Sequence, residues 1–176
     1  TVNKRTKTIE RSKHHTTKPF NSRIISIKEL THQEKLFELE VDENFSYRPG
    51  QFVEVSLFGV GEAPISISSS PTRNPKRIEL CVRAAGNMTK AMHKLKKGSY
   101  VWIRGPFGNG FNPEEFKNKD LLFIAGGLGY APLRSLIYYV LDNKENYRNI
   151  SIFYGTKNPN LLLYKNEIEE LSQRKD

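Results

Sequence analysis

The chain has 176 residues, of which 37% are hydrophobic and 11% aromatic, a composition typical of a folded globular protein. Its single cysteine, Cys81, excludes an intrachain disulfide and cannot alone hold a zinc ion or an iron–sulfur cluster. No apolar run approaches the roughly 20 residues that cross a bilayer, and the N-terminus lacks the apolar core of a secretory signal, so we expect a cytoplasmic protein.

The net charge of +9 would suggest nucleic-acid binding if it were spread over the fold, but it is concentrated at the N-terminus. Residues 1–18 hold six basic residues and one acidic residue, a net charge of +5, which leaves +4 for the other 158 residues. Because these first residues show no apolar periodicity, we predict a flexible basic arm. The arm could dock on an acidic partner, although a solvated tail is the simpler interpretation.

Residues 19–112 show short alternating segments separated by turn residues, which predict strands. The expected strands are Ser22–Lys28, Leu36–Val41, Gln51–Phe58, Pro64–Ser70, Arg77–Ala84 and Tyr100–Arg104. Six short strands at this spacing predict a closed antiparallel barrel of Greek-key type. Between the last two, Asn87–Lys96 carries Met88, Met92 and Leu95 at helical spacing, which predicts a helix packed on the barrel.

Residues 118–176 follow a different pattern, in which apolar strands alternate with helices. We expect strands at Leu121–Ala125 and Ile150–Tyr154 and helices at Pro132–Leu141 and Leu161–Ser172. This order predicts a parallel sheet covered by helices, as in a Rossmann-like α/β domain. Because a doubly wound sheet usually has about five strands or more, we expect the N-terminal part of a nucleotide-binding domain and a chain that is a piece of a longer protein.

The most informative segment is the glycine turn between the first of these strands and its helix. Gly126, Gly127 and Gly129 offer bare backbone N–H groups, and Pro132 suits the first turn of a helix. A helix N-terminus after such a turn is a binding site for pyrophosphate. The same residues could also serve only to make a tight turn.

Three further segments have two interpretations each. The alternate hydroxyls of Gly61–Pro71 could line a site or a solvated strand face. Gly86 and Thr89 start the predicted short helix, where they could bind an anion or simply cap it. The three glycines of Arg104–Phe111 permit close backbone approach but also suit a linker turn.

Taken in order, these motifs resemble the ferredoxin–NADP reductase superfamily. The residues that carry the resemblance are Phe58–Pro71, Gly105–Phe111, Gly126–Arg134, Tyr154–Lys157 and Leu162–Tyr164. The amino-acid sequences of these segments are most similar to those of the flavin subunits of multi-subunit NAD(P)-linked hydrogenases and anaerobic sulfite or sulfur reductases. The resemblance implies an FAD-binding barrel followed by an NAD(P)-binding α/β domain.

The resemblance also implies roles for individual residues. Beside the flavin and its phosphates it places Pro64, Ile65, Ser66, Val82, Arg83, Gly86, Met88 and Thr89. Around the nicotinamide dinucleotide it places Gly105, Pro106, Gly126, Gly127, Gly129, Pro132, Gly155 and Thr156. The Ser66 hydroxyl is the one catalytic candidate, expected to hydrogen-bond flavin N5 and orient it rather than act as a base.

One departure from the family pattern concerns the flavin strand. Ala63 and Ile65 stand where the family commonly has a phosphate-binding arginine and a flavin-stacking tyrosine. Loss of a bidentate cation weakens phosphate binding, and Arg83 is our candidate for part of the compensation. The hydrogenase-like branch resembles this chain in both positions.

The implied activity is NAD(P)H-linked flavin electron transfer. The cofactors would be FAD and NADH or NADPH, between which the sequence does not decide; Lys157 could favour NADPH, although a solvated lysine is the simpler interpretation. No metal ligands are predicted in the chain, so a [2Fe-2S] centre would belong to a later segment or to a partner. The implied partners are iron–sulfur, hydrogenase or reductase catalytic subunits in a hetero-oligomer.

Three alternatives stay open at this stage. The electron-transfer subunit of dihydroorotate dehydrogenase shares the barrel and the Pro64–Ile67 run. A basic barrel that binds single-stranded nucleic acid would need exposed stacking aromatics. Phe37, Phe52 and Phe58 instead fall in predicted strands, where burial explains them, and the glycine turn would have no role. A cofactor-free docking subunit would account for Ala63 and for the truncated second domain.

Overall fold

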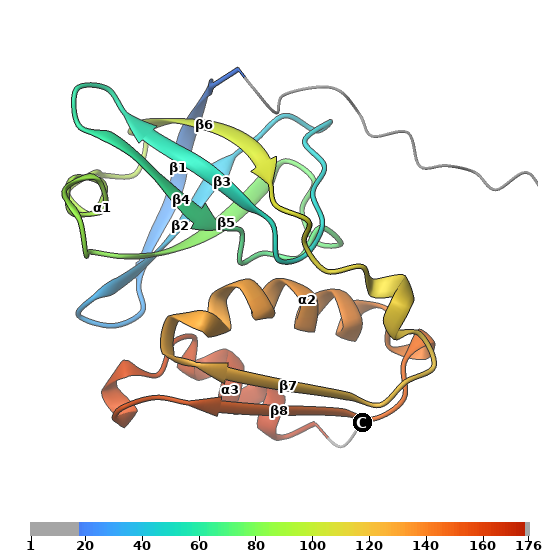
Figure 1. Cartoon of the computed structure of the whole chain (residues 1–176). Coiled ribbons are helices and arrows are strands. Elements are labelled where there is room, and N and C mark those ends of the chain that lie inside the picture. The colour runs from blue at the N-terminus through green and yellow to red at the C-terminus, as the bar shows by residue number, and fades with distance from the viewer. Residues whose placement is uncertain (1–17, 175–176) are drawn as a thin grey trace, which may run out of the picture.

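The structure is a computed structural model that describes residues 18–174. It consists of a barrel stacked on an α/β half, with one helix, α2, between the barrel and a two-stranded sheet (Figure 1). The predicted flexible arm falls almost entirely on residues 1–17, which lie outside the described residues. None of the helices in residues 18–174 combines the length and the apolar character needed to cross a membrane.

The predicted Greek-key barrel is confirmed. Its strands are β1 (Phe20–Glu29), β2 (Glu34–Glu40), β3 (Phe52–Leu57), β4 (Gly61–Ser66), β5 (Arg77–Arg83) and β6 (Tyr100–Phe107). They pair antiparallel in the order β4-β3-β6-β1-β2-β5. A bridge between Ile67 and Leu80, with the Ser68 N–H donating to the Glu79 carbonyl at 2.8 Å, joins the two ends of this order and closes the barrel.

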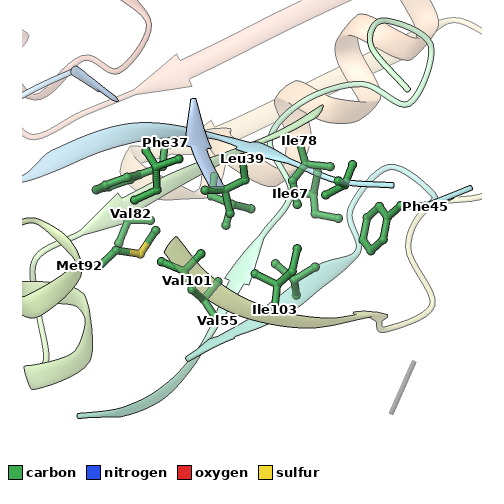
Figure 2. Close-up of a cluster of buried hydrophobic side chains, with 14 of the residues drawn as sticks. Phe37, Leu39, Phe45, Val55, Ile67, Ile78, Val82, Met92, Val101 and Ile103 are labelled. Carbon is green, nitrogen blue, oxygen red and sulfur yellow. The ribbon is translucent and has the colours of Figure 1, made fainter. Parts of the chain in front are cut away.

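The barrel interior is filled by alternate side chains of its strands, as the period of two requires. Figure 2 shows Phe37, Leu39, Val55, Val101 and Ile103 converging from three strands, and none of them is exposed to solvent. Full burial of one such side chain contributes roughly 1.5–3 kcal/mol to folding. This core is what makes the barrel a rigid platform.

The helix on the barrel, α1 (Asn87–Met92), is shorter than the predicted Asn87–Lys96. Met88 and Met92 are buried against the barrel as expected. After Met92 the backbone tightens: the N–H of Leu95 donates to the Met92 carbonyl, an i to i−3 bond that ends the regular helix. Leu95 still packs against the core from this turn.

Two predictions around β4 are wrong. The strand ends at Ser66 rather than Ser70, because the chain then changes partner from β3 to β5: the N–H of Ile67 donates to Gln51 of the β3 side, and that of Ser68 donates to Glu79 of β5. Phe58 is not a buried strand residue. It lies in the turn after β3 and is 98% exposed.

The α/β half contains the predicted parallel pair of strands. Its main elements are β7 (Leu121–Gly126), α2 (Tyr130–Asp142), β8 (Ile150–Gly155) and α3 (Lys165–Ser172). Short 3-10 turns precede, separate or follow them: η1 (Pro113–Phe116), η2 (Gly127–Gly129), η3 (Lys144–Asn146) and η4 (Pro159–Leu161). The two strands run in register from the pair Leu121 and Ile150 to the pair Gly126 and Gly155.

Helix α3 begins four residues later than predicted, at Lys165 instead of Leu161. The preceding residue, Tyr164, has a left-handed backbone with φ of 52°. Leu163 and Tyr164 are 1% and 3% exposed, so this conformation turns both side chains into the core before the helix starts.

The two halves share a second apolar core. Leu36 and Cys81 from the barrel pack in one cluster with Leu136, Ile137 and Tyr164 from the α/β half. The halves are therefore in direct apolar contact rather than linked only by the chain between them.

Candidate functional site

The glycine turn stands at the carboxyl ends of β7 and β8, where parallel α/β sheets bind ligands. Gly126 and Gly155 are register partners, so the glycine ends of both strands lie side by side. A Cβ atom built at Gly126, Gly127, Gly129 or Gly155 would meet no atom within 4 Å. Only Gly127, at φ of +49°, needs glycine for its backbone conformation. The other three leave open space that a ligand could fill.

The start of α2 supplies the polar groups for this open space. No side chain caps the helix, and its first turn holds no acidic residue. Tyr130 is the first residue of α2, so Pro132 lies in the first turn as predicted. Uncapped N–H groups and the positive end of the helix dipole favour a negatively charged group, and pyrophosphate fits this chemistry.

Tyr154 of β8 holds the glycine turn in place, a role that sequence reasoning missed. Its hydroxyl donates to the Gly127 carbonyl at 3.0 Å and accepts from the Leu163 N–H at 3.3 Å. Its ring stacks on Tyr130, with ring centroids 4.5 Å apart. A tyrosine inside an apolar strand gave a signal, since a buried hydroxyl needs a partner. The turn is thus held in one conformation by side chains on both of its flanks.

A second open glycine starts α1 on the barrel. A Cβ at Gly86 would meet nothing within 4 Å. The Thr89 hydroxyl accepts from the N–H groups of Ala85 and Gly86 at 3.1 and 3.0 Å and donates to the Gly86 carbonyl. Thr89 therefore caps the helix. Met88 is 6% exposed and its side chain belongs to the barrel core, which leaves its backbone for any contact with a ligand.

Strand β4 lies next to α1 and is an edge of the sheet, with β3 as its one strand partner over the described residues Gly61–Ser66. An edge strand leaves backbone donors and acceptors unpaired, and a flavin ring can use such groups. Ala63 and Ile65 pack against the barrel core, whereas Pro64 is exposed. Alternation places Ser66 on the Pro64 side. The three predicted flavin residues thus do not share one face.

The predicted residues on β5 and β6 differ in their surroundings. Val82 is fully buried in the barrel core. Gly105 and Pro106 lie near the end of β6, where Phe107 pairs with Phe52, which in turn pairs with Ser66. A Cβ at Gly105 would approach the Phe52 carbonyl to 3.2 Å, so the barrel itself requires this glycine. Ser66 and Gly105–Pro106 are brought to the same end of the barrel.

The two arginines nearest to these residues already have carboxylate partners. Nε of Arg83 lies 2.5 Å from Glu34, a side chain that is 1% exposed. Arg104 makes two bonds to Glu62, at 3.0 and 2.5 Å, which lower the pKa of the Glu62 carboxyl. The Arg83 side chain is nevertheless 41% exposed. Its predicted contact with FAD phosphates stays a prediction.

The remaining predicted residue, Thr156, follows β8 directly. Its hydroxyl donates to the Asn158 carbonyl at 2.9 Å, which fixes the turn after Gly155. Within residues 18–174, no three His, Cys, Asp or Glu side chains gather where they could hold a metal ion. The open glycines and the uncapped start of α2 can bind and orient a ligand that carries its own reactivity.

Comparison with known proteins places both halves. A family model of the oxidoreductase FAD-binding domain matches residues 21–111, and one of the oxidoreductase NAD-binding domain matches residues 123–176. The chain belongs to the FAD-binding oxidoreductases. Its barrel is thus an FAD-binding domain, and its α/β half is a nicotinamide-dinucleotide-binding domain.

Relatives of this oxidoreductase include subunits of two kinds of complex. The gamma subunit of sulfhydrogenase 2 from Pyrococcus furiosus is 50% identical over 157 residues, which are 86% of this chain and 54% of that protein. The gamma subunit of sulfhydrogenase 1 from the same organism is 44% identical, over 85% of this chain and 52% of that protein. A probable electron transfer subunit of dihydroorotate dehydrogenase B from P. furiosus is 34% identical, over 77% and 48%. The chain spans about half the length of these relatives.

Solved structures agree on the fold of the FAD-binding oxidoreductases. Ferredoxin-NADP+ reductase from Plasmodium falciparum superposes with a TM-score of 0.77 at 21% identity, over 91% of this chain and 68% of that one. The Amycolatopsis cytochrome P450 reductase GcoB gives 0.73 at 20% identity, over 89% and 48%. The chain has the ferredoxin–NADP reductase fold.

Proposed function

We propose that the chain is the FAD- and NAD(P)-binding part of an electron-transfer subunit of a larger redox complex, of the hydrogenase or sulfur reductase type. In this role it exchanges electrons between NAD(P)H and an iron–sulfur centre of a later segment or a partner subunit. The observation that carries the proposal is the 50% identity to a sulfhydrogenase gamma subunit across both halves. The cytoplasm, where NAD(P)H is available, is the proposed compartment.

The residues present fit the two nucleotides. Four open glycines and the uncapped start of α2 provide backbone donors for the dinucleotide of NAD(P)H, and Gly105, Pro106 and Thr156 flank it. The corresponding position for FAD is the start of α1 beside the free edge of β4, where Gly86 leaves open space and Thr89 fixes the turn. When bound, FAD supplies the chemistry that converts two-electron transfer into single-electron steps. The chain's residues bind and orient the rings, with Ser66 as the proposed partner of flavin N5.

An absorption spectrum and an anaerobic titration test this function. We expect the purified chain to show flavin bands, or to acquire them with FAD, and to lose them on addition of NADH or NADPH. The nucleotide that bleaches the bands at the lower concentration is the one that the chain prefers. A chain that stays colourless after incubation with FAD would overturn the proposal, and so would a bound flavin that neither nucleotide reduces.

The second candidate is the electron-transfer subunit of dihydroorotate dehydrogenase. The 34% identity to the P. furiosus protein over 135 residues favours it, although less than the sulfhydrogenase relatives do. The two candidates share cofactors and differ in partner. Co-purification decides between them: a hydrogenase or sulfur reductase catalytic subunit supports the first candidate, and a dihydroorotate-oxidising subunit supports the second.

A further inference from the structure

Arg134 is the most deeply buried cation among the described residues, and nucleotide binding as proposed above does not use it. Its side chain comes from α2 and is 6% exposed. Nη1 donates to the Ser68 carbonyl at 2.9 Å and to the Glu79 carboxylate at 2.6 Å. Nε and Nη2 donate to the two oxygens of Glu167 at 2.8 and 2.9 Å. One guanidinium therefore joins α2 and α3 to the barrel.

Aromatic rings and a second hydrogen bond reinforce this link. The guanidinium carbon lies 4.5 Å from the ring centre of Tyr164 and 5.0 Å from that of Tyr138, distances typical of cation–π contacts. The next residue, Ser135, donates to the Ser69 carbonyl at 2.5 Å. Consecutive residues of α2 thus hold consecutive carbonyls of the barrel, those of Ser68 and Ser69.

The location of these contacts connects the two proposed cofactor sites. Ser68 follows Ser66, the proposed flavin contact, by two residues. Helix α2 begins at Tyr130, where the glycine turn ends, and Arg134 lies four residues later, which is about one helical turn. A shift at this link would move the segment that holds the flavin relative to the turn that holds the nicotinamide nucleotide. Hydride transfer needs the reacting atoms about 3–3.5 Å apart, and a misplacement of about 1 Å can cost about 100-fold in rate.

Stability alone does not explain a charge at this place. Replacing a buried ion pair by apolar side chains of similar volume is often neutral or stabilising, whereas the directional bonds of the pair fix one geometry. Burial lowers the pKa of Arg134, but its bonds to Glu167 and the charge of Glu79 more than offset this, so the pKa is raised and the group stays charged.

We propose that Arg134 is a positioning residue that fixes the placement of the nucleotide-binding half against the flavin-binding barrel through Ser68, Glu79 and Glu167. The cofactor part of this inference rests on the proposed function. The mechanical part, that Arg134 holds the two halves together, stands on the contacts alone.

The test removes the charge without leaving its two carboxylate partners as unpaired buried charges. In the triple variant Arg134→Met, Glu79→Gln, Glu167→Gln, methionine fills most of the volume and the two amides carry no charge. Arg73→Ala is the matched control, because Arg73 also links the barrel to α2, through Asp142 at 3.3 Å, but from an exposed rim where its side chain is 48% exposed. Exposed pairs of this kind contribute little.

The first readout needs no cofactor and uses Cys81, the chain's one cysteine, which is 5% exposed in the core between the halves. We expect a thiol reagent to label Cys81 at least about 10-fold faster in the triple variant, at unchanged thermal midpoint, because the halves separate more often without unfolding. The Arg73→Ala control labels at the wild-type rate. Unchanged labelling in the triple variant overturns the inference.

The second readout is the rate of flavin reduction by NAD(P)H in rapid mixing, compared with photoreduction of the same flavin. We expect the triple variant to lose about 10- to 100-fold in the nucleotide-driven rate, with FAD content, nucleotide affinity and photoreduction unchanged. A stable triple variant that is reduced at the wild-type rate shows that Arg134 is merely structural. If wild-type flavin is not reduced by either nucleotide, the proposed function fails, and Cys81 labelling still decides the role of Arg134.

Discussion

The barrel and the α/β half bury their strands to different degrees. In the barrel, every strand contributes residues to a closed interior, and Leu39, Val55 and Ile103 are fully buried. Among residues 18–174, the two-stranded sheet has only one covered face. Its other face leaves Leu122 at 59%, Ile124 at 69% and Phe153 at 64% exposed. The difference shows that the barrel strands enclose a core on their own, whereas the two-stranded sheet packs a core on one of its faces and leaves the other to solvent.

The largest expected effect is a cavity in the barrel. Leu39→Ala deletes a side chain that is 0% exposed, and we expect a loss of about 2–5 kcal/mol in the free energy of unfolding. Urea titration followed by circular dichroism measures it. Phe58→Ala is the control, because Phe58 is 98% exposed, and it should change stability by less than about 0.5 kcal/mol. Equal losses in the two variants would contradict the assignment of the core.

A smaller effect separates binding from folding in the α/β half. In Gly129→Val the new side chain enters open space from a right-handed backbone, with φ of −61°, so the fold tolerates it. The valine would occupy the proposed pyrophosphate position, and we expect the Kd for NAD(P)H to rise at least about 10-fold, which corresponds to about 1.4 kcal/mol. Titration by flavin or nucleotide fluorescence measures this change.

The matched control for that prediction is Ser151→Val, on an exposed position of β8 that pairs with Leu122 on the uncovered face. It adds the same side chain away from the glycine turn. If Gly129→Val binds the nucleotide as tightly as wild type, or if Ser151→Val loses as much affinity, the glycine turn is not part of the binding site.

A third prediction concerns pH and the contact between the halves. Burial raises the pKa of the Cys81 thiol from 9.0 to about 12. The folded chain therefore keeps this proton above pH 9 while the unfolded chain loses it. The thiol's contribution to the free energy of unfolding is fully present below pH 9 and is lost as pH rises toward 12. Unfolding titrations between pH 8 and pH 11 should show stability falling with a steeper slope in wild type than in Cys81→Ala. Identical slopes would mean that the thiol is solvated.

The smallest expected effect lies on the barrel surface. Arg104→Gln breaks the ion pair with Glu62, in which both side chains are 35% exposed. Exposed pairs contribute little to stability because water and salt screen them, so the midpoint of thermal unfolding should move by only a few degrees. A pH titration of Glu62 by NMR gives an independent check, because its pKa should return toward the usual range once Arg104 is gone.

Periodicity predicted the strands because each one buries alternate residues, whichever strand it pairs with. The alternation of β2, β3 and β5 directly reflects which residues face the barrel interior. Periodicity failed to predict the end of β4, because Ile65 and Ile67 both face inward although the strand partner changes between them. Hydrophobic pattern records the face of a residue and not its hydrogen-bond partner.

The misplaced start of α3 and the unnoticed Arg134 have a common cause. Leu161–Leu163 has an apolar pattern that suits a helix, but tertiary burial of Leu163 and Tyr164 overrides it. Arg134 in an amphipathic helix reads as a solvated residue. Its acceptors Glu79 and Glu167 are 55 and 33 residues away, and no local pattern shows such distant partners.

The Tyr154 hydroxyl donates to the Gly127 carbonyl and so restrains the glycine turn from within the protein. A ligand that meets a fixed loop loses little freedom in ordering it. We therefore expect encounter, rather than rearrangement, to set the association rate. Substitutions around the turn should then change mainly how long the nucleotide stays bound. In the proposed function, this residence time would set how quickly one nucleotide replaces another.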